Sequence, residues 1–263
     1  MKRILIVAVI VGVAYFVLQD LGVLGSAVRP PANLPANTRL VFLHGGPGFD
    51  DYMQEIFSEH FANYGIFYTQ SKGPNIKVSH LVGELNQKIQ PNSKTILVGH
   101  SWGGVLALEA LRYPQIAQRV SGLVIISSPL LASQEAEFQR ALAQLSEPSV
   151  ANIFLSIAEK ESWQPFLAKV MKTFDRELAN RFRDSYLNKL NLAPVLSSLR
   201  IPVLHIYGSD DIRVPAAGQR AYTKFRPNLQ VLEIPHGGHF PFLIDNHRAQ
   251  VSQAIWDFVG QIK

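Results

Sequence analysis

The chain has 263 residues, 47% of them hydrophobic and only 17% charged, which suits one globular domain and argues against a disordered or coiled-coil chain. It contains no cysteine, which excludes disulfides, a thiol nucleophile, thiolate zinc sites and iron–sulfur clusters. The net charge is +5, but apart from Lys2 and Arg3 the basic residues are scattered, so we expect no nucleic-acid partner.

The N-terminal segment 1–27 has the layout of a signal sequence or a membrane anchor. A basic start at 2–3 precedes an uncharged apolar run at 4–18, and small residues at 25–27 offer a cleavage site. A helix over 4–18 reaches about 22 Å, whereas one extended to Leu24 would span a hydrocarbon core of about 30 Å. An ordinary buried helix is the third interpretation, but such a helix would normally show a polar face.

The basic start also predicts the orientation of the chain. Lysine and arginine beside an apolar segment remain on the cytoplasmic side of a membrane. We therefore expect a membrane-anchored protein with its main domain outside the cytoplasm, or a protein exported after signal cleavage, and we favour the anchor. Residues 28–37, rich in proline, are expected to form a stiff linker to a domain over 38–263.

The rest of the chain alternates strand and helix patterns. Short apolar runs predict strands at 39–43, 66–68, 95–98, 120–127, 203–207 and 229–234. Apolar residues at three- and four-residue spacing predict helices at 51–64, 78–89, 102–113 and 251–262. Continuous apolar strands joined by helix-length crossovers indicate a mainly parallel sheet of about six strands with helices on both faces.

One segment interrupts this alternation. Between about 131 and 199 only helical patterns occur, at roughly 133–145, 149–160, 163–173 and 175–190. This length exceeds one crossover, so we expect a helical cap inserted between the fourth and fifth strands. Its aromatic residues should mostly pack the cap, with a few facing a substrate pocket: Phe138, Phe154, Trp163, Phe166, Phe174, Phe182 and Tyr186.

A candidate nucleophile follows the third strand. The sequence from Gly99 to Gly104 reads GHSWGG, which matches G-x-S-x-G at a strand-to-helix junction. Such a sharp turn exposes the hydroxyl of Ser101 above the sheet, while the flanking glycines allow close backbone packing. The helix that begins there directs N–H groups toward a developing anion.

A glycine-rich turn follows the first strand, at His44-Gly45-Gly46-Pro47-Gly48. Backbone freed of side chains suits N–H groups that face an oxyanion, and we expect the Gly46 and Trp102 N–H groups to form this oxyanion hole. A phosphate loop is the alternative, but neither G-x-x-x-x-G-K nor G-x-G-x-x-G is present. We interpret His44 as a structural turn residue.

Acids and histidines follow the fifth and sixth strands. A serine nucleophile requires a histidine to take its proton and a carboxylate to orient that histidine. Parallel strands place their ends at one edge of a sheet, so these groups can meet Ser101. The acid is Asp210 or Asp211, and the base is His236 or His239. These histidines, with His44, His100 and His205, lack the spacing of a metal site, and we expect neither metal nor cofactor.

Residues 38–263 resemble the α/β-hydrolase fold family, and HGGPG with GHSWGG most resembles its proline iminopeptidase-like branch. The resemblance implies that Ser101 is the nucleophile. It implies Asp211 as the acid through the spacing G-x-x-D-x-x-x-P, and His239 as the base through Gly-His-Phe-Pro. The chain order serine, acid, histidine is that of the family.

The chain also departs from the family. The branch carries a D-Q-R-G-x-G-x-S stretch where this chain, at 69–74, keeps Gln70 but lacks the acidic and arginine positions. The family's first two strands have no counterpart here, so we expect six strands in place of the usual eight. The linker could cover the edge of the sheet that this leaves exposed.

The function expected is a serine hydrolase that cleaves a small ester with a short, uncharged acyl group through an acyl-enzyme. The alternatives are an iminopeptidase-like aminopeptidase and a non-catalytic binding protein of the same fold. An aminopeptidase needs a carboxylate for the substrate ammonium. The cap acids are read mostly as solvated: Glu135, Glu137, Glu147, Glu159, Glu161, Asp175, Glu177 and Asp184.

Overall fold

The computed structural model describes residues 28–147 and 149–262. The signal or anchor predicted for 1–27 lies outside these residues. Within the described ranges, no helix combines the length and the apolar character that a membrane crossing requires.

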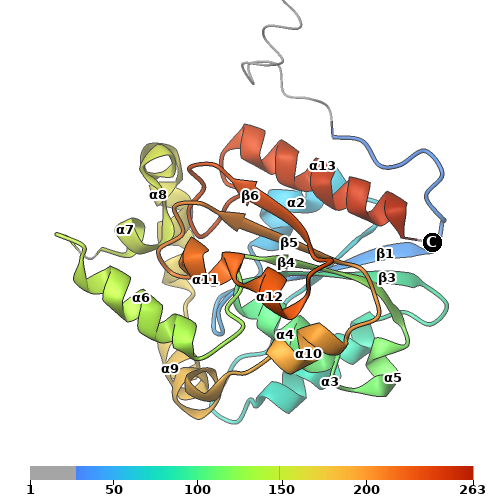
Figure 1. The fold of residues 1–263 in the computed structure, drawn as a ribbon, viewed down its shortest axis with the longest axis horizontal. Coiled ribbons are helices and arrows are strands. Elements are labelled where there is room, and N and C mark those ends of the chain that lie inside the picture. The colour runs from blue at the N-terminus through green and yellow to red at the C-terminus, as the bar shows by residue number, and fades with distance from the viewer. Residues whose placement is uncertain (1–27, 148, 263) are drawn as a thin grey trace, which may run out of the picture.

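A sheet of six parallel strands forms the centre of the domain, in the order β2-β1-β3-β4-β5-β6 (Figure 1). The strands are β1 (Thr38–Leu43), β2 (Gly65–Tyr68), β3 (Lys94–His100), β4 (Val120–Ile126), β5 (Val203–Gly208) and β6 (Gln230–Ile234). The inner strands are almost wholly buried, which explains their continuous apolar runs. This arrangement confirms the predicted fold class.

Helices cover both faces of the sheet (Figure 1). One face carries α2 (Met53–Phe61) and α13 (Asp245–Gln261), and the other carries α3 (Val78–Lys88), α4 (Trp102–Ala110), α5 (Pro114–Ala117), α10 (Ala193–Ser198) and α12 (Tyr222–Phe225). Alternate residues of β1 serve the two cores: Leu40 and Phe42 pack toward α2, and Val41 and Leu43 toward α4.

The insertion between β4 and β5 folds as a helical cap. It comprises α6 (Ser133–Ala143), α7 (Val150–Phe154), α8 (Ile157–Lys172), α9 (Arg176–Ser185) and the 3-10 helix η1 (Leu187–Lys189). An antiparallel bridge between Leu131 and Asn191 joins its two ends. The segment therefore leaves and re-enters the main domain at one point. Helix α10, which lay inside the expected cap segment, packs on α4 and α12 instead.

Some helix boundaries differ from the predicted ones, both in the cap and in the C-terminal helix. The predicted helix 149–160 ends at Phe154, and a new helix begins at Ile157. The cause is local: Glu159 accepts a hydrogen bond from the Ser156 N–H at 2.8 Å, which caps the new helix. Helix α13 begins at Asp245, six residues before the predicted start at 251.

The linker lies along α13 (Figure 1). The Arg29 N–H donates to the Gln253 side chain at 3.2 Å, and Pro31 packs close to Gly260 of α13. Leu34 packs against the core between α13 and the sheet.

Candidate active site

Ser101 occupies a strained turn between β3 and α4. Its backbone has φ 53° and ψ −120°, a left-handed conformation that is unusual for a residue with a side chain. The Ser101 N–H donates to the carbonyl of Ile126 at 2.8 Å. A Cβ at Gly103 would lie 2.1 Å from the Leu43 carbonyl oxygen, so only glycine allows α4 to approach β1 this closely. The strained turn and the close packing together explain the G-x-S-x-G pattern.

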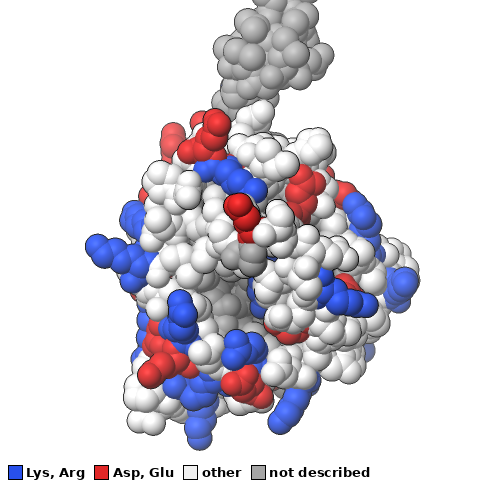
Figure 2. Space-filling view, turned by 90° about the vertical axis from the view of Figure 1, so that its left-hand side faces the viewer, with Lys and Arg blue, Asp and Glu red and all other residues white. Residues whose placement is uncertain are grey.

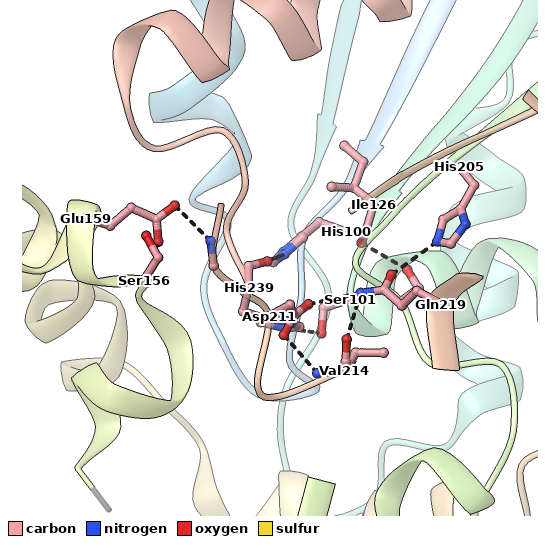
Figure 3. A network of polar contacts seen from close by, with 12 residues as sticks. His100, Ser101, Ile126, Ser156, Glu159, His205, Asp211, Val214, Gln219 and His239 are labelled. Atoms are coloured by element: carbon pink, nitrogen blue, oxygen red, sulfur yellow. Dashed lines mark hydrogen bonds and ion pairs between the residues drawn. The ribbon is translucent and has the colours of Figure 1, made fainter. Parts of the chain in front are cut away.

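The structure brings together the three side chains that the resemblance implied (Figure 3). The Ser101 hydroxyl lies 2.9 Å from Nε2 of His239, and Nδ1 of His239 lies 3.0 and 3.1 Å from the two carboxylate oxygens of Asp211. Asp211 follows β5 and His239 follows β6, so neighbouring parallel strands deliver both residues. His239 and Asp211 are buried, whereas Ser101 faces the pocket.

Further donors hold the carboxylate of Asp211. Oδ1 accepts the Val214 N–H at 2.8 Å, and Oδ2 accepts the side-chain amide of Gln219 at 3.2 Å. Gln219 lies in the short helix α11 (Ala216–Arg220) and accepts a hydrogen bond from Nε2 of His205 at 3.1 Å. Burial lowers the pKa of His205 to about 4, so this imidazole is neutral and donates through Nε2. Sequence reasoning missed Gln219.

The competing acid and base point away from this site. Asp210 and His236 lie at the surface, where their side chains are 43% and 82% exposed and contact each other at 3.6 Å. Asp210 also accepts a hydrogen bond from the Ser209 hydroxyl. Neither residue contacts Ser101 in the described part of the chain.

The residues expected to form the oxyanion hole, Gly46 and Trp102, both line the pocket around Ser101. Among the described residues, neither backbone N–H has a hydrogen-bond acceptor. Gly46 has φ 134°, which favours glycine. Both N–H groups are therefore free to donate to a substrate oxygen.

His44 and Gln70 support this turn. His44 is buried and neutral, because burial lowers its pKa to about 4. It donates to the Gly45 carbonyl at 2.7 Å and accepts the Gln70 N–H at 3.2 Å. The Gln70 side chain donates to the His44 carbonyl at 2.9 Å and accepts the Trp102 indole N–H at 2.8 Å. Gln70 thereby joins the glycine-rich turn to Trp102, the residue that follows Ser101.

His100 connects the same turn to the loop of His239. The Tyr52 hydroxyl donates to Nδ1 of His100 and accepts the Gly45 N–H at 2.7 Å. Nε2 of His100 donates to the His239 carbonyl at 2.7 Å. Burial holds the pKa of His100 well below its ordinary value, so the ring stays neutral in this chain of hydrogen bonds. His100 is a buried support and does not face solvent.

A cavity of about 350 Å³ opens beside Ser101. Aromatic side chains of both the cap and the core contribute to its walls: Phe49, Phe138, Phe154, Phe174 and Phe240. Three cap aromatics thus face the pocket, while Trp163 and Phe166 pack on one core and Phe182 and Tyr186 pack near Trp102. On the cap side of the molecule, basic and acidic side chains are interspersed around a hollow (Figure 2).

Charged groups of both signs line the cavity. The cations are Arg176, Arg183 and Arg213, and within the described ranges the acid is Glu135. Glu135 forms a salt bridge with Arg213 at 3.0 Å, and both side chains are mostly buried. The carboxylate is therefore already neutralised by a guanidinium.

One cap acid departs from the expected solvated position. Glu159 is fully buried at the junction of the cap with the loop of His239. The sequence did hold a signal for it, because Ser156-Ile157-Ala158-Glu159 matches the S-x-x-E capping pattern.

Fold and site together define a class of protein: an α/β domain with a serine, a histidine and an aspartate at the carboxyl edge of its sheet. The Alpha/beta hydrolase family matches residues 40–254 of this chain. The chain belongs to that family.

Individual relatives match either a short segment of this chain or most of the chain at low sequence identity. A pimeloyl-[acyl-carrier protein] methyl ester esterase from Xanthomonas oryzae pv. oryzae is 42% identical over 78 residues, 30% of each chain. A proline iminopeptidase from Saccharolobus solfataricus is 36% identical over 109 residues, 35% of this chain and 34% of that protein. The matched segments thus span about a third of either relative.

An esterase structure from a Rhodococcus species covers 86% of this chain and 91% of its own, with TM-score 0.67 and 18% identity. At that identity the likeness is one of fold. The relationship to the iminopeptidase is distant and partial, so the α/β-hydrolase family is the level at which the resemblance is confirmed.

Proposed function

We propose that this protein is a serine esterase in which Ser101, His239 and Asp211 act as nucleophile, base and acid. The observation that carries the proposal is the continuous hydrogen-bonded chain from the Ser101 hydroxyl through both ring nitrogens of His239 to Asp211. That chain ends at a cavity with two free backbone N–H groups. These are the parts that acyl transfer through a serine requires.

The first half of the reaction forms an acyl-enzyme. Oγ of Ser101 attacks the ester carbonyl carbon while Nε2 of His239 takes the hydroxyl proton. The carbonyl oxygen becomes an oxyanion that the Gly46 and Trp102 N–H groups stabilise. When the intermediate collapses, the bond to the alcohol oxygen breaks and His239 returns the proton to the leaving alcohol.

The second half releases the acid. Water takes the place of the alcohol, and Nε2 of His239 accepts a proton as the water oxygen attacks the acyl carbon. The bond to Oγ of Ser101 then breaks, and the proton returns to that oxygen. Asp211 keeps the imidazole oriented throughout, and its remaining contacts with Val214 and Gln219 fix the carboxylate itself.

The pocket favours an ester over an N-terminal peptide. An aminopeptidase must bind a substrate ammonium with a free carboxylate, but Glu135 is already paired with Arg213. Of the other charged groups on the described wall, Arg176 repels an ammonium group, and Arg183 is paired with Asp184 at 3.1 Å. The aromatic walls and the cavity of about 350 Å³ suit a short, uncharged acyl group. A relative that is named as a methyl ester esterase supports the same choice.

We expect the purified domain to hydrolyse short-chain p-nitrophenyl esters faster than proline β-naphthylamide, because nothing free in the described pocket wall binds the proline ammonium. Glu135→Gln should leave the proline substrate a poor one, and the exposed Glu161→Gln serves as the matched control. Faster release from the proline substrate, abolished by Glu135→Gln but not by Glu161→Gln, would instead establish the aminopeptidase.

We also propose that residues 1–27 place this domain outside the cytoplasm, as an anchor or a cleaved signal. The basic start and the apolar run support this, and the linker after residue 28 begins on the surface beside α13. Fractionation with N-terminal sequencing should find an intact N-terminus in the membrane fraction. A soluble mature protein that begins at Val28 would show a cleaved signal, and an intact chain in the cytosol would contradict both forms of the proposal.

A further inference from the structure

The cap accepts two hydrogen bonds from backbone N–H groups in the loop of the catalytic base. The His239 N–H donates to the carbonyl of Phe154 at 3.0 Å, and the Gly238 N–H donates to Oε1 of Glu159 at 3.1 Å. The other oxygen of Glu159 accepts the Ser156 N–H at 2.8 Å. Figure 3 shows Glu159 reaching from the cap toward this loop.

We propose that Glu159 is a positioning residue, whose buried carboxylate fixes the loop of His239 to the cap and thereby holds the base at its hydrogen-bonding distance from Ser101. The inference rests on the proposed function, in which His239 is the base. Glu159 does not touch the substrate cavity or Ser101; it acts through Gly238 and the residue that follows it.

The packing at Gly238 shows how closely the two parts fit. A Cβ at this position would lie 2.5 Å from Oε2 of Glu159, 2.6 Å from the Ser156 nitrogen and 2.9 Å from the Phe154 carbonyl oxygen. Two of these neighbours are backbone atoms, which cannot rotate away. The glycine before His239 is therefore required by contact with the cap.

The contact requires a carboxylate in particular. Both partners of Glu159 are N–H donors, and an ionised carboxylate offers only acceptors. Glutamine would turn an amide donor toward one of the two N–H groups. Protonation of Glu159 likewise removes one acceptor, so the contact is complete only in the ionised form.

Ionisation of Glu159 is costly to the fold. Burial is the main cause that raises its pKa from 4.5 to about 7, and the charge of Asp211 on the loop after β5 adds to the increase. Because the folded chain favours the protonated form, the free energy of unfolding falls as the pH rises from 4.5 to about 7. Ionised Glu159 thus lowers the free energy of unfolding but completes both hydrogen bonds. A role in positioning the loop of His239 explains this combination better than a role in stabilising the fold.

The test compares Glu159→Gln with Glu161→Gln, an exposed glutamate of the same helix. In Glu159→Gln we expect kcat for a short-chain ester at pH 8 to fall by about tenfold, with KM within about twofold, because the base is displaced rather than the binding site.

The acid limb of the kcat/KM profile should also move to lower pH, because the variant lacks both the titrating group and a negative charge near His239 and Asp211. Glu161→Gln should change neither. A Glu159→Gln profile that superimposes on that of the wild type would overturn the proposal.

Amide hydrogen exchange decides the same question without a substrate. In the wild type, the peptide over 236–240 should lose protection, relative to intrinsic exchange, as the pH falls through about 7 and the carboxylate protonates. Glu159→Gln should be poorly protected at every pH. Constant protection in the wild type from pH 8 to 4, a window that spans both the ordinary and the raised pKa of Glu159, would contradict the inference, even if the variant fails to fold. If the wild type reacts with no ester and no active-serine probe, the proposed function fails, while hydrogen exchange still tests the role of Glu159.

Discussion

Ser101→Ala should lower ester turnover by a factor of about 10⁶, to the level of residual catalysis by the oxyanion hole and binding. The variant retains His239 and the cavity but has no atom that can form the acyl-enzyme. A factor of 10⁶ corresponds to about 8 kcal/mol in the activation free energy. Steady-state kinetics on a short-chain p-nitrophenyl ester measures the loss.

Ser127→Ala is the matched control for this variant. Ser127, like Ser101, follows the end of a strand and has a positive φ, here 45°. Unlike Ser101 it is fully buried, and its hydroxyl has no hydrogen-bond partner in the described part of the chain. It should retain turnover close to that of the wild type. Turnover in Ser101→Ala as high as in Ser127→Ala, with unchanged circular dichroism spectra, would show that the hydroxyl of Ser101 is not the nucleophile.

The second large effect separates neighbouring residues. Asp211→Asn should lower kcat by about 10⁴, because an amide in place of the carboxylate favours the wrong tautomer of His239. His239→Ala should cost at least as much, because it removes the base. Asp210→Asn and His236→Ala should stay within about threefold of the wild type, since these exposed side chains contact each other rather than Ser101.

The four variants are measured together, with kcat determined at a fixed pH near 8. Equal losses in Asp210→Asn and Asp211→Asn would contradict the geometry, because Asp211 alone of the two contacts the base. Full activity in His239→Ala would place the base elsewhere.

The architecture was predictable because continuous apolar runs and turn glycines are local signals. Each strand of the sheet was located to within three residues at either end, and the serine turn after β3 followed from its glycines. The choice of Asp211 over Asp210 did not follow from physical reasoning on the sequence and needed the family spacing. The structure adds the reason: Asp211 points inward toward Val214 and Gln219, and Asp210 points to solvent.

The supporting residues were not predictable because no local sequence pattern marks their contacts. The two partners of Gln70 lie 26 positions before it and 32 positions after it. Gln219 contacts Asp211, eight positions earlier, from a helix of only five residues. Glu159 resembled the other cap acids in composition, and only its burial against Gly238 distinguishes it. The S-x-x-E pattern marks it as a helix cap but holds no information about a loop 79 residues away.

Labelling by a fluorophosphonate, followed by peptide mass spectrometry, reports on the nucleophile without any assumption about the substrate. The probe needs an activated serine, and the short path from Asp211 through His239 to Ser101 supplies one. We expect a single adduct on the peptide that contains Ser101 in the wild type and no adduct in Ser101→Ala. A wild-type protein that remains unlabelled, or a label that persists in Ser101→Ala, would show that this chain is not a serine hydrolase acting through Ser101.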